Sequence, residues 1–183
     1  MKLIKILLCI FICLTTTIKV DSNDDLQTVF KEEGKLIFIR HAYAPGVGDP
    51  NNFDISDCST QRNLNEEGIK QSKSIGVFFV KNNIKIDKVI SSEWCRCKDT
   101  ASYAFKFFES KSFLNSFYSQ KFYYNKTKQI KDLKEYIGKW DKKKNLVLVT
   151  HFVVISEVLN IGVSQAEIII TDRKFKVLTR TKF

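Results

Sequence analysis

The chain has 183 residues, of which 44% are hydrophobic. This length suits a single domain of about 100–200 residues, and the composition excludes a largely disordered protein. The formal net charge of +10 favours anionic partners such as phosphorylated metabolites, nucleic acid or anionic lipid. Because the lysines are spread along predicted helices, a solvated basic face explains them better than nucleic-acid contact, and no nucleic-acid partner is expected.

The N-terminus has the order of a secretory signal. Two lysines precede the wholly apolar run 6–14, and small residues follow at Val20 and Ser22, near where a signal peptidase would cut. The apolar run is too short to span a bilayer, although an uncleaved anchor or a buried strand is the alternative. We therefore expect a signal peptide over 1–22 and a domain over 23–183. The protein would be exported to the periplasm or secreted, with no stable membrane span.

Two apolar runs, 36–41 and 146–151, predict buried strands, and each ends in one of the two histidines of the chain. Arg40 stands directly before His41, and the second run ends in His151. A permanent cation beside an imidazole suits an anionic substrate together with a nucleophile or base. A surface arginine and ordinary core histidines are the alternative interpretation.

The other segments alternate between helical and extended patterns. The last two predicted strands are expected to form a hairpin. This alternation predicts an α/β fold, a three-layer sandwich with a mostly parallel central sheet and helices on both faces. Helices are predicted over 65–82, 94–108, 127–140 and 152–159, strands over 84–92, 166–171 and 175–181, a short strand within 113–124, and a loop over 44–63.

Four basic side chains follow the ends of three predicted strands. Arg96 lies in the first turn of a helix, where backbone amides and the helix dipole favour an anion. A solvated pairing with Asp99 is the alternative. Ligands bind at the carboxyl ends of strands in open α/β sheets, so Arg40, Arg96 and the two histidines are expected on one side of the sheet. Arginines bind phosphate oxygens in pairs, and nearby guanidinium groups keep an imidazole neutral and nucleophilic. No metal-ligand cluster or phosphate loop appears in the sequence.

Three cysteines lie beyond the predicted signal: Cys58, Cys95 and Cys97. An oxidising compartment favours one disulfide and one free thiol. Because cysteines two positions apart rarely bond to each other, Cys58 is expected to pair with Cys95 or Cys97, and Cys97 is the predicted partner. A zinc site is the weaker alternative, since no histidine is close in sequence.

Four short motifs follow one another along the chain: Arg40-His41-Ala42, residues 64–68 with Gln71, Ser91-Ser92 to Arg96 with Thr100-Ala101, and Val149-Thr150-His151. In this order they resemble the motifs of the histidine phosphatase superfamily, which includes the cofactor-dependent phosphoglycerate mutases. The resemblance implies a phosphoglycerate mutase-like three-layer fold and a phosphohistidine formed on His41. It also implies that Arg40, Arg96 and His151 hold the phosphoryl group until water hydrolyses it.

The sequence departs from the family pattern at two points. Ala42 replaces the usual glycine, a mild change in a position for small residues. The general acid is also missing from its usual places, because residues 113–117 hold no carboxylate and Phe152 follows the second histidine. Glu93 or Asp49 is the candidate acid, and Glu93 as a carboxylate of the helix-capping turn is the alternative. Without such an acid, leaving groups of low pKa are preferred.

Together these features predict a metal-independent phosphomonoester hydrolase that uses no cofactor and acts on a phosphorylated small molecule or phosphoprotein. Arg62 is expected to reach the substrate from the loop, and a solvated loop arginine is the alternative. A mutase is less favoured, because the chain is short and lacks a longer insert to cover the substrate. A catalytically weak or inactive phosphate-binding or anion-binding module of the same fold is the main alternative.

Overall fold

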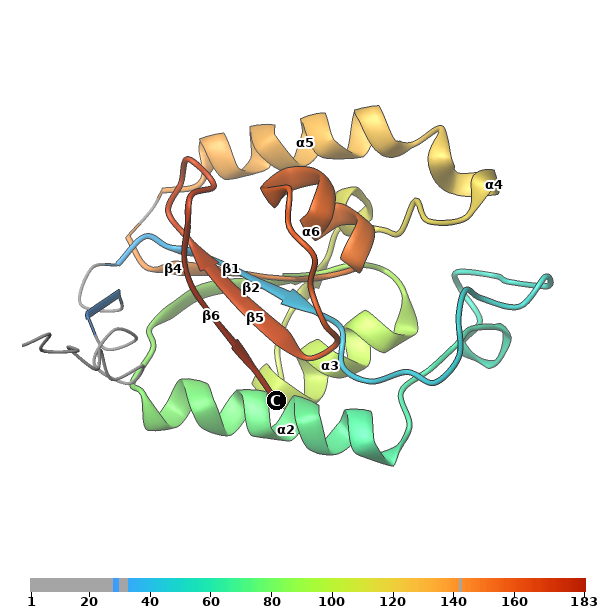
Figure 1. Cartoon of the computed structure of the whole chain (residues 1–183), viewed down its shortest axis with the longest axis horizontal. Coiled ribbons are helices and arrows are strands. Elements are labelled where there is room, and N and C mark those ends of the chain that lie inside the picture. Colours follow the sequence, from blue (N-terminus) through green and yellow to red (C-terminus); the bar gives the residue numbers. More distant parts are fainter. Residues whose placement is uncertain (1–27, 30–32, 142) are drawn as a thin grey trace, which may run out of the picture.

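The computed structural model of the chain describes residues 28–29, 33–141 and 143–183 (Figure 1). The predicted signal peptide, 1–22, lies outside the described residues. The strands are β1 (Leu36–Arg40), β2 (Ile86–Ser91), β3 (Glu109–Ser110), β4 (Asn145–Thr150), β5 (Glu167–Thr171) and β6 (Val177–Lys182). The helices are α2 (Glu66–Lys81), α3 (Cys95–Phe105), α4 (Gln120–Tyr123), α5 (Lys126–Lys139) and α6 (Phe152–Leu159), with 3-10 turns at Cys58–Thr60 and Ser112–Leu114. No helix within these ranges is long and apolar enough to cross a membrane.

The strands form one mixed sheet in the order β3-β2-β4-β1-β5-β6. Strands β1 to β4 are parallel to one another, whereas β5 pairs antiparallel with β1 and forms an antiparallel hairpin with β6. The predicted α/β class and the closing hairpin are therefore confirmed. Since β2, β4 and β1 are successive neighbours, their carboxyl ends meet at one edge of the sheet.

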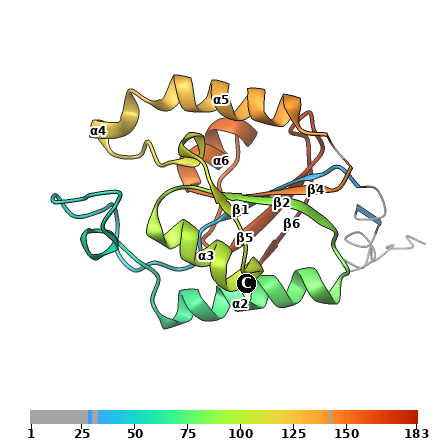
Figure 2. The ribbon, with the colours of Figure 1, turned by 180° about the vertical axis from the view of Figure 1, so that it is seen from behind.

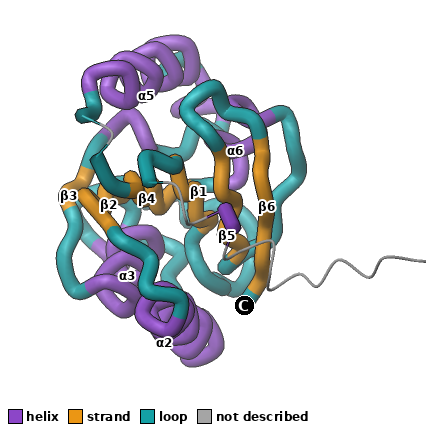
Figure 3. The backbone as a smooth tube through the Cα atoms, turned by 90° about the vertical axis from the view of Figure 1, so that its left-hand side faces the viewer, coloured by secondary structure: helices purple, strands orange, loops and turns teal. Residues whose placement is uncertain are grey.

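Alternation along the central strands divides the core between the two faces of the sheet. Ile37 and Ile39 of β1 belong to the apolar cluster beneath α2 and α3, while Leu36 and Phe38 belong to the cluster beneath α5 and α6. Figure 3 shows the sheet edge-on between these two pairs of helices, and Figure 2 shows the same layers from behind. The apolar strand pattern thus reflects burial on both faces.

Helix α2 begins as its sequence predicts. The Asn65 side chain accepts a hydrogen bond from the backbone N–H of Gly68 at 3.0 Å, which caps the helix. Gly76 lies directly against the Ala104 carbonyl of α3, where an added Cβ would collide. This close approach fixes α3 against α2, and α3 in turn carries Arg96 to the edge of the sheet.

Helix α3 and the segment after it differ from the sequence-based expectation. The helix ends at Phe105 because Lys106 adopts a left-handed conformation, with φ of 66°. The short strand expected within 113–124 lies earlier in the chain, where β3 pairs with the last residues of β2. The aromatic segment instead contains a 3-10 turn and α4, so its apolar residues do not extend the sheet.

The prediction that Cys58 bonds to Cys97 is wrong, because the disulfide joins Cys58 to Cys95. Residues two positions apart on an α-helix point about 200° away from each other. Cys95 faces the loop that carries Cys58, whereas Cys97 is a buried free thiol whose Sγ lies 3.5 Å from Nε2 of His151. The disulfide therefore ties the long loop after β1 to the start of α3.

Candidate active site

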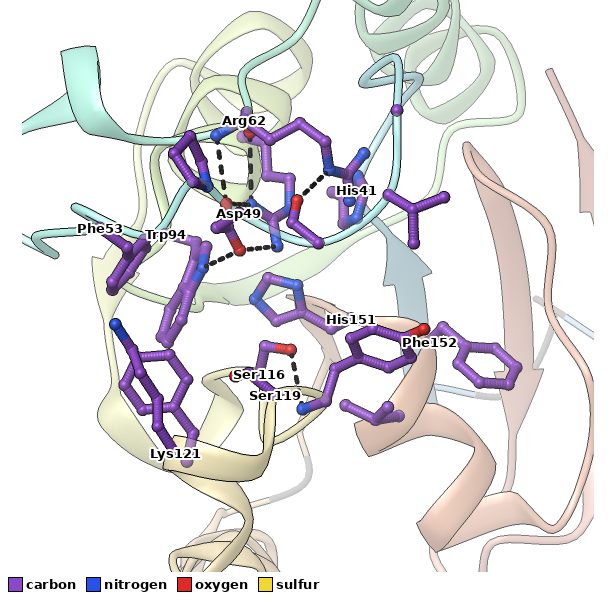
Figure 4. Close-up of a pocket in the computed structure, with 18 of the residues that line it drawn as sticks. His41, Asp49, Phe53, Arg62, Trp94, Ser116, Ser119, Lys121, His151 and Phe152 are labelled. Atoms are coloured by element: carbon purple, nitrogen blue, oxygen red, sulfur yellow. Dashed lines mark hydrogen bonds and ion pairs between the residues drawn. The ribbon is translucent and has the colours of Figure 1, made fainter.

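The predicted arginines and histidines meet at the carboxyl ends of β1, β4 and β2. Backbone hydrogen bonds extend the sheet one residue beyond the strands: His41 N–H donates to the Thr150 carbonyl and Ser92 N–H to that of Val149, both at 2.9 Å. A cavity of about 330 Å³ opens at this edge (Figure 4). Its lining includes all five predicted basic residues, namely Arg40, His41, Arg62, Arg96 and His151.

The His41 ring is held in a single tautomer. Its Nδ1 lies 2.8 Å from the Ala42 carbonyl oxygen, which can only accept, so Nδ1 carries the proton. The lone pair of Nε2 is therefore available in the neutral ring, and no hydrogen bond within the described residues occupies it. Burial, followed by the positive charge of Arg96, holds the pKa of His41 well below its usual range. The ring is thus neutral and fixed in orientation, with an unprotonated Nε2.

His151 is the second imidazole of the cavity, and its ring centroid lies 5.5 Å from that of His41. Its Nε2 is 2.8 Å from the Ser92 hydroxyl, which also contacts Oδ1 of Asn115 at 3.1 Å. The assignment that satisfies both contacts has Ser92 donating to Asn115 and the His151 Nε2–H donating to Ser92. Burial and the charge of Arg96 lower the pKa of His151 as well, so this ring is also neutral.

Glu93 does not line the cavity that holds the two histidines. Its carboxylate accepts a hydrogen bond from Nδ2 of Asn115 at 2.6 Å, and its backbone N–H donates to Oδ1 of the same side chain. Glu93 therefore stands at the far end of a chain of contacts that runs through Asn115 and Ser92 to His151. This arrangement links Glu93 to His151 through hydrogen bonds and keeps its side chain out of the cavity lining.

Arg96, 3% exposed, pairs with Asp49 and not with Asp99. The Asp49 carboxylate accepts from both terminal nitrogens of the guanidinium, at 2.7 and 3.2 Å. Burial raises the pKa of Asp49, but hydrogen bonds and the charge of Arg96 outweigh burial and hold that pKa below its usual value. Asp49 is therefore ionised and has no proton to give to a leaving group.

Arg62 and Arg40 are positioned by backbone carbonyls. Arg62 donates to the Gly48 carbonyl at 2.7 Å and to the Ala44 carbonyl, so it holds the loop after β1 in a closed turn while its guanidinium lines the cavity. Arg40 donates to the Val163 carbonyl at 2.8 Å, and its guanidinium carbon lies 5.7 Å from the centre of the Phe152 ring. Phe152, at the place where one branch of the resembled superfamily has an aspartate, thus packs against a cation.

One wall of the cavity is aromatic. Phe53 stacks on Trp94 with ring centroids 4.9 Å apart, and Phe122 meets Trp94 edge-on at 5.5 Å. The Lys121 ammonium lies 5.0 Å from the centre of the Phe122 ring, which adds a positive charge to this side (Figure 4). No residue of this wall could be assigned from the sequence pattern, although the aromatic content of the segment after α3 was a signal for it.

Neither a reactive thiol nor a metal centre is evident in the described part of the chain. Burial raises the pKa of the Cys97 thiol to about 12, so this group stays protonated beside His151. Residues 28–29, 33–141 and 143–183 hold no group of three or more histidine, cysteine or carboxylate side chains that could bind a metal ion.

A mixed sheet between two helical layers, with two histidines and three arginines at its carboxyl edge, defines a phosphoglycerate mutase-like α/β fold. No protein-family model and no curated protein matches the chain in sequence. Solved structures do match it in fold. The protein histidine phosphatase SixA complexed with tungstate has a TM-score of 0.58 at 12% identity, with 81% of this chain and 96% of that chain covered.

Two further structures extend the comparison. The SixA protein of Agrobacterium tumefaciens matches with a TM-score of 0.56 and 16% identity, over 81% of this chain and 98% of its own. Phosphoglycerate mutase from Thermus thermophilus matches with a TM-score of 0.58 and 15% identity, over 81% and 99% of the two chains. The predicted likeness to the histidine phosphatase superfamily is therefore confirmed at the level of the fold.

Proposed function

We propose that this protein is a phosphomonoester hydrolase that works through a covalent phosphohistidine on His41. The observation that carries the proposal is the His41 ring itself. Its proton is held on Nδ1 by the Ala42 carbonyl, and its free Nε2 belongs to a cavity lined by three arginines. An unprotonated imidazole with a fixed tautomer is a suitable nucleophile for phosphorus.

The reaction has two steps. Nε2 of His41 forms a bond to phosphorus while the bond from phosphorus to the leaving atom breaks, and the leaving group departs with that electron pair. Water then attacks phosphorus, the P–N bond breaks, and its electron pair returns to Nε2. The oxygen of the water ends in orthophosphate, and its protons are shared between phosphate and solvent.

The arginines supply the positive charge that the transferring group requires. Arg40, Arg62 and Arg96 line the cavity beside His41 and His151. Charge in phosphoryl transfer builds on the equatorial oxygens, and guanidinium groups stabilise it there. We therefore propose a metal-independent reaction without a cofactor, and turnover should be unchanged by EDTA.

The leaving group is expected to depart without a proton from the protein. Among the described residues that line the cavity, Asp49 is the one carboxylate, and its oxygens are bound by Arg96. Good leaving groups, such as aryl oxides or the imidazole of a phosphorylated histidine, suit such a site. A phosphoprotein is therefore a fitting substrate beside small phosphorylated molecules, in keeping with the description of SixA as a protein histidine phosphatase.

We also propose that the protein works outside the cytoplasm. The signal-like order of residues 1–22 motivates this, and the Cys58–Cys95 disulfide supports it, because structural disulfides persist in oxidising compartments. Fractionation of cells that produce the full chain would test it. Recovery of the protein in the reduced form from the cytoplasm would contradict export.

The test of the mechanism is to trap the intermediate. The protein is mixed with a reactive aryl phosphate and quenched, and an acid-labile, base-stable phosphoryl adduct is sought by mass spectrometry. The adduct should map to His41 and be absent from His41→Ala, whose thermal unfolding is measured beside it. Full turnover by a folded His41→Ala protein would refute the mechanism.

An anion-binding module of the same fold remains the second candidate. One specific observation favours it: Asp49, the one carboxylate among the described residues that line the cavity, is bound by Arg96, so the cavity offers no free general acid for turnover. Such a module would bind orthophosphate and release no product from any phosphate ester. Binding and turnover measured on one preparation therefore separate the two candidates.

A further inference from the structure

Arg96 uses its hydrogen-bond donors unevenly. Nη1 donates to Oδ1 of Asp49 at 2.7 Å and to the Arg62 carbonyl at 3.3 Å, while Nη2 donates to Oδ2 of Asp49 at 3.2 Å. Nε is buried and has no partner within the described residues. Of the five N–H groups of this guanidinium, three are therefore used, and the two left over are on Nε and Nη2.

Those two remaining groups belong to one edge of the guanidinium. The N–H of Nε and the second N–H of Nη2 point in parallel, which is the fork that receives two oxygens of a phosphate or carboxylate. Asp49 fills the opposite, terminal edge of Arg96. Because Arg96 lines the cavity beside His41, the unfilled edge is a ready-made place for two phosphoryl oxygens.

Asp49 is itself fixed by contacts that do not involve Arg96. Trp94 Nε1–H donates to Oδ2 of Asp49, and the backbone N–H of Arg62 donates to Oδ1, both at 3.1 Å (Figure 4). The loop that carries Asp49 is fastened to α3 by the stacking of Phe53 on Trp94 and by the Cys58–Cys95 disulfide. A carboxylate held by these contacts keeps its position beside Arg96 and is not displaced when a substrate binds.

We propose that Asp49 is a positioning residue: it binds the terminal edge of Arg96 and so presents the Nε and Nη2 edge to the phosphoryl group next to His41. The inference rests on the proposed function, which it deepens by assigning how one arginine binds the transferring group. It also explains why a negative charge stands in a cavity for an anion, because the same charge neutralises and orients a buried guanidinium.

The test measures orthophosphate binding by calorimetry in the full protein and in Asp49→Asn. Removal of a negative charge would by itself strengthen anion binding, so a weaker affinity isolates the positioning effect. We expect the dissociation constant to rise about tenfold or more, with kcat/KM for an aryl phosphate falling in parallel. Asp54→Asn is the matched control, because among the described residues this carboxylate on the same loop accepts hydrogen bonds from Ser56 alone, and the change should leave both values as they are.

Two further variants guard against a purely structural effect. In an Arg96→Lys background, which has no second edge to orient, Asp49→Asn should cause no additional loss of phosphate affinity. Trp94→Phe removes one hydrogen bond to Asp49 while keeping the aromatic packing, and it should weaken phosphate binding by about two- to fivefold. If Asp49→Asn does not fold, unchanged phosphate affinity in Trp94→Phe overturns the proposal.

Each remaining outcome is decisive. Equal or tighter phosphate binding by folded Asp49→Asn would mean that Asp49 competes with the phosphoryl group, and the proposal would be wrong. Unchanged binding with loss of turnover only for esters with poor leaving groups would make Asp49 a proton donor, which also overturns it. Failure of the proposed function is read separately, from the absence of a His41 adduct in the unmodified protein.

Discussion

The two histidines occupy equivalent places and have unlike surroundings. Each follows the last residue of a central parallel strand, and each is buried among the same arginines. Yet Nδ1–H of His41 donates a hydrogen bond to the Ala42 carbonyl and Nε2 has no hydrogen bond within the described residues, whereas Nε2 of His151 is hydrogen-bonded to Ser92. The comparison teaches that position in the fold provides an imidazole, while the local hydrogen bonds decide which of its two ring nitrogens carries the proton.

The largest expected effect on kcat comes from replacing each of the two histidines by glutamine in separate variants. His41→Gln should lower kcat by at least about 10³-fold, because no other side chain supplies the bond to phosphorus. His151→Gln should lower it by about 10²-fold, as expected for one lost stabilising group, and should still form the adduct on His41. Single-turnover kinetics with an aryl phosphate would check both values. An equal fall in kcat in the two variants, with no phosphoryl adduct in either, would contradict the different roles assigned to the two rings.

A smaller effect is expected from the contact that distinguishes His151. Ser92→Ala removes the partner of Nε2 and breaks the path to Asn115 and Glu93, so the ring loses its fixed orientation. We expect kcat to fall about tenfold with little change in adduct position. Steady-state rates would measure this. Ser56→Ala, on the exposed loop, serves as the matched control, and an equal fall in that variant would contradict the assignment.

The smallest effect concerns stability as a function of pH. Burial lowers the pKa of both histidines in the folded state, so that state binds their protons more weakly than the unfolded chain does. As the pH falls below about 6.5, the unfolded state gains protons and the free energy of unfolding decreases. Each histidine contributes at most about 1.4 kcal/mol per pH unit. Urea unfolding between about pH 7 and pH 5 should therefore show a shallower decline in His41→Gln and in His151→Gln. Identical slopes in all three proteins would contradict this.

The sequence was most informative where structure is local. The helix over 152–159 and the cap at Asn65 follow from side-chain pattern and capping chemistry, and both match the structure. The order of the strands was not predictable, because periodicity shows burial and is silent on which parallel strands become neighbours. Their adjacency is what turns separate basic residues into one cavity.

Besides the aromatic wall, sequence reasoning missed the contacts that the loop after β1 makes with the start of α3. Asp49 meets Arg96 across 47 positions, and Cys58 bonds to Cys95 across 37. Loops carry no hydrophobic period, so their folded path depends on contacts that only the finished structure supplies. Asp99, the close acid C-terminal to Arg96 in sequence, was for the same reason the wrong partner for it.

The backbone hydrogen bonds at the ends of the strands have a mechanical consequence. His41 and Ser92 each lie one residue beyond the end of their strand. Their backbone N–H groups donate to carbonyls of β4, and these hydrogen bonds fix their positions. The spacing between these two residues is therefore set by the register of the sheet. A slip by one residue would send each imidazole to the opposite layer. The relative positions of the residues at the ends of these strands therefore depend on the pairing of the strands, and they are kept as long as that register is kept.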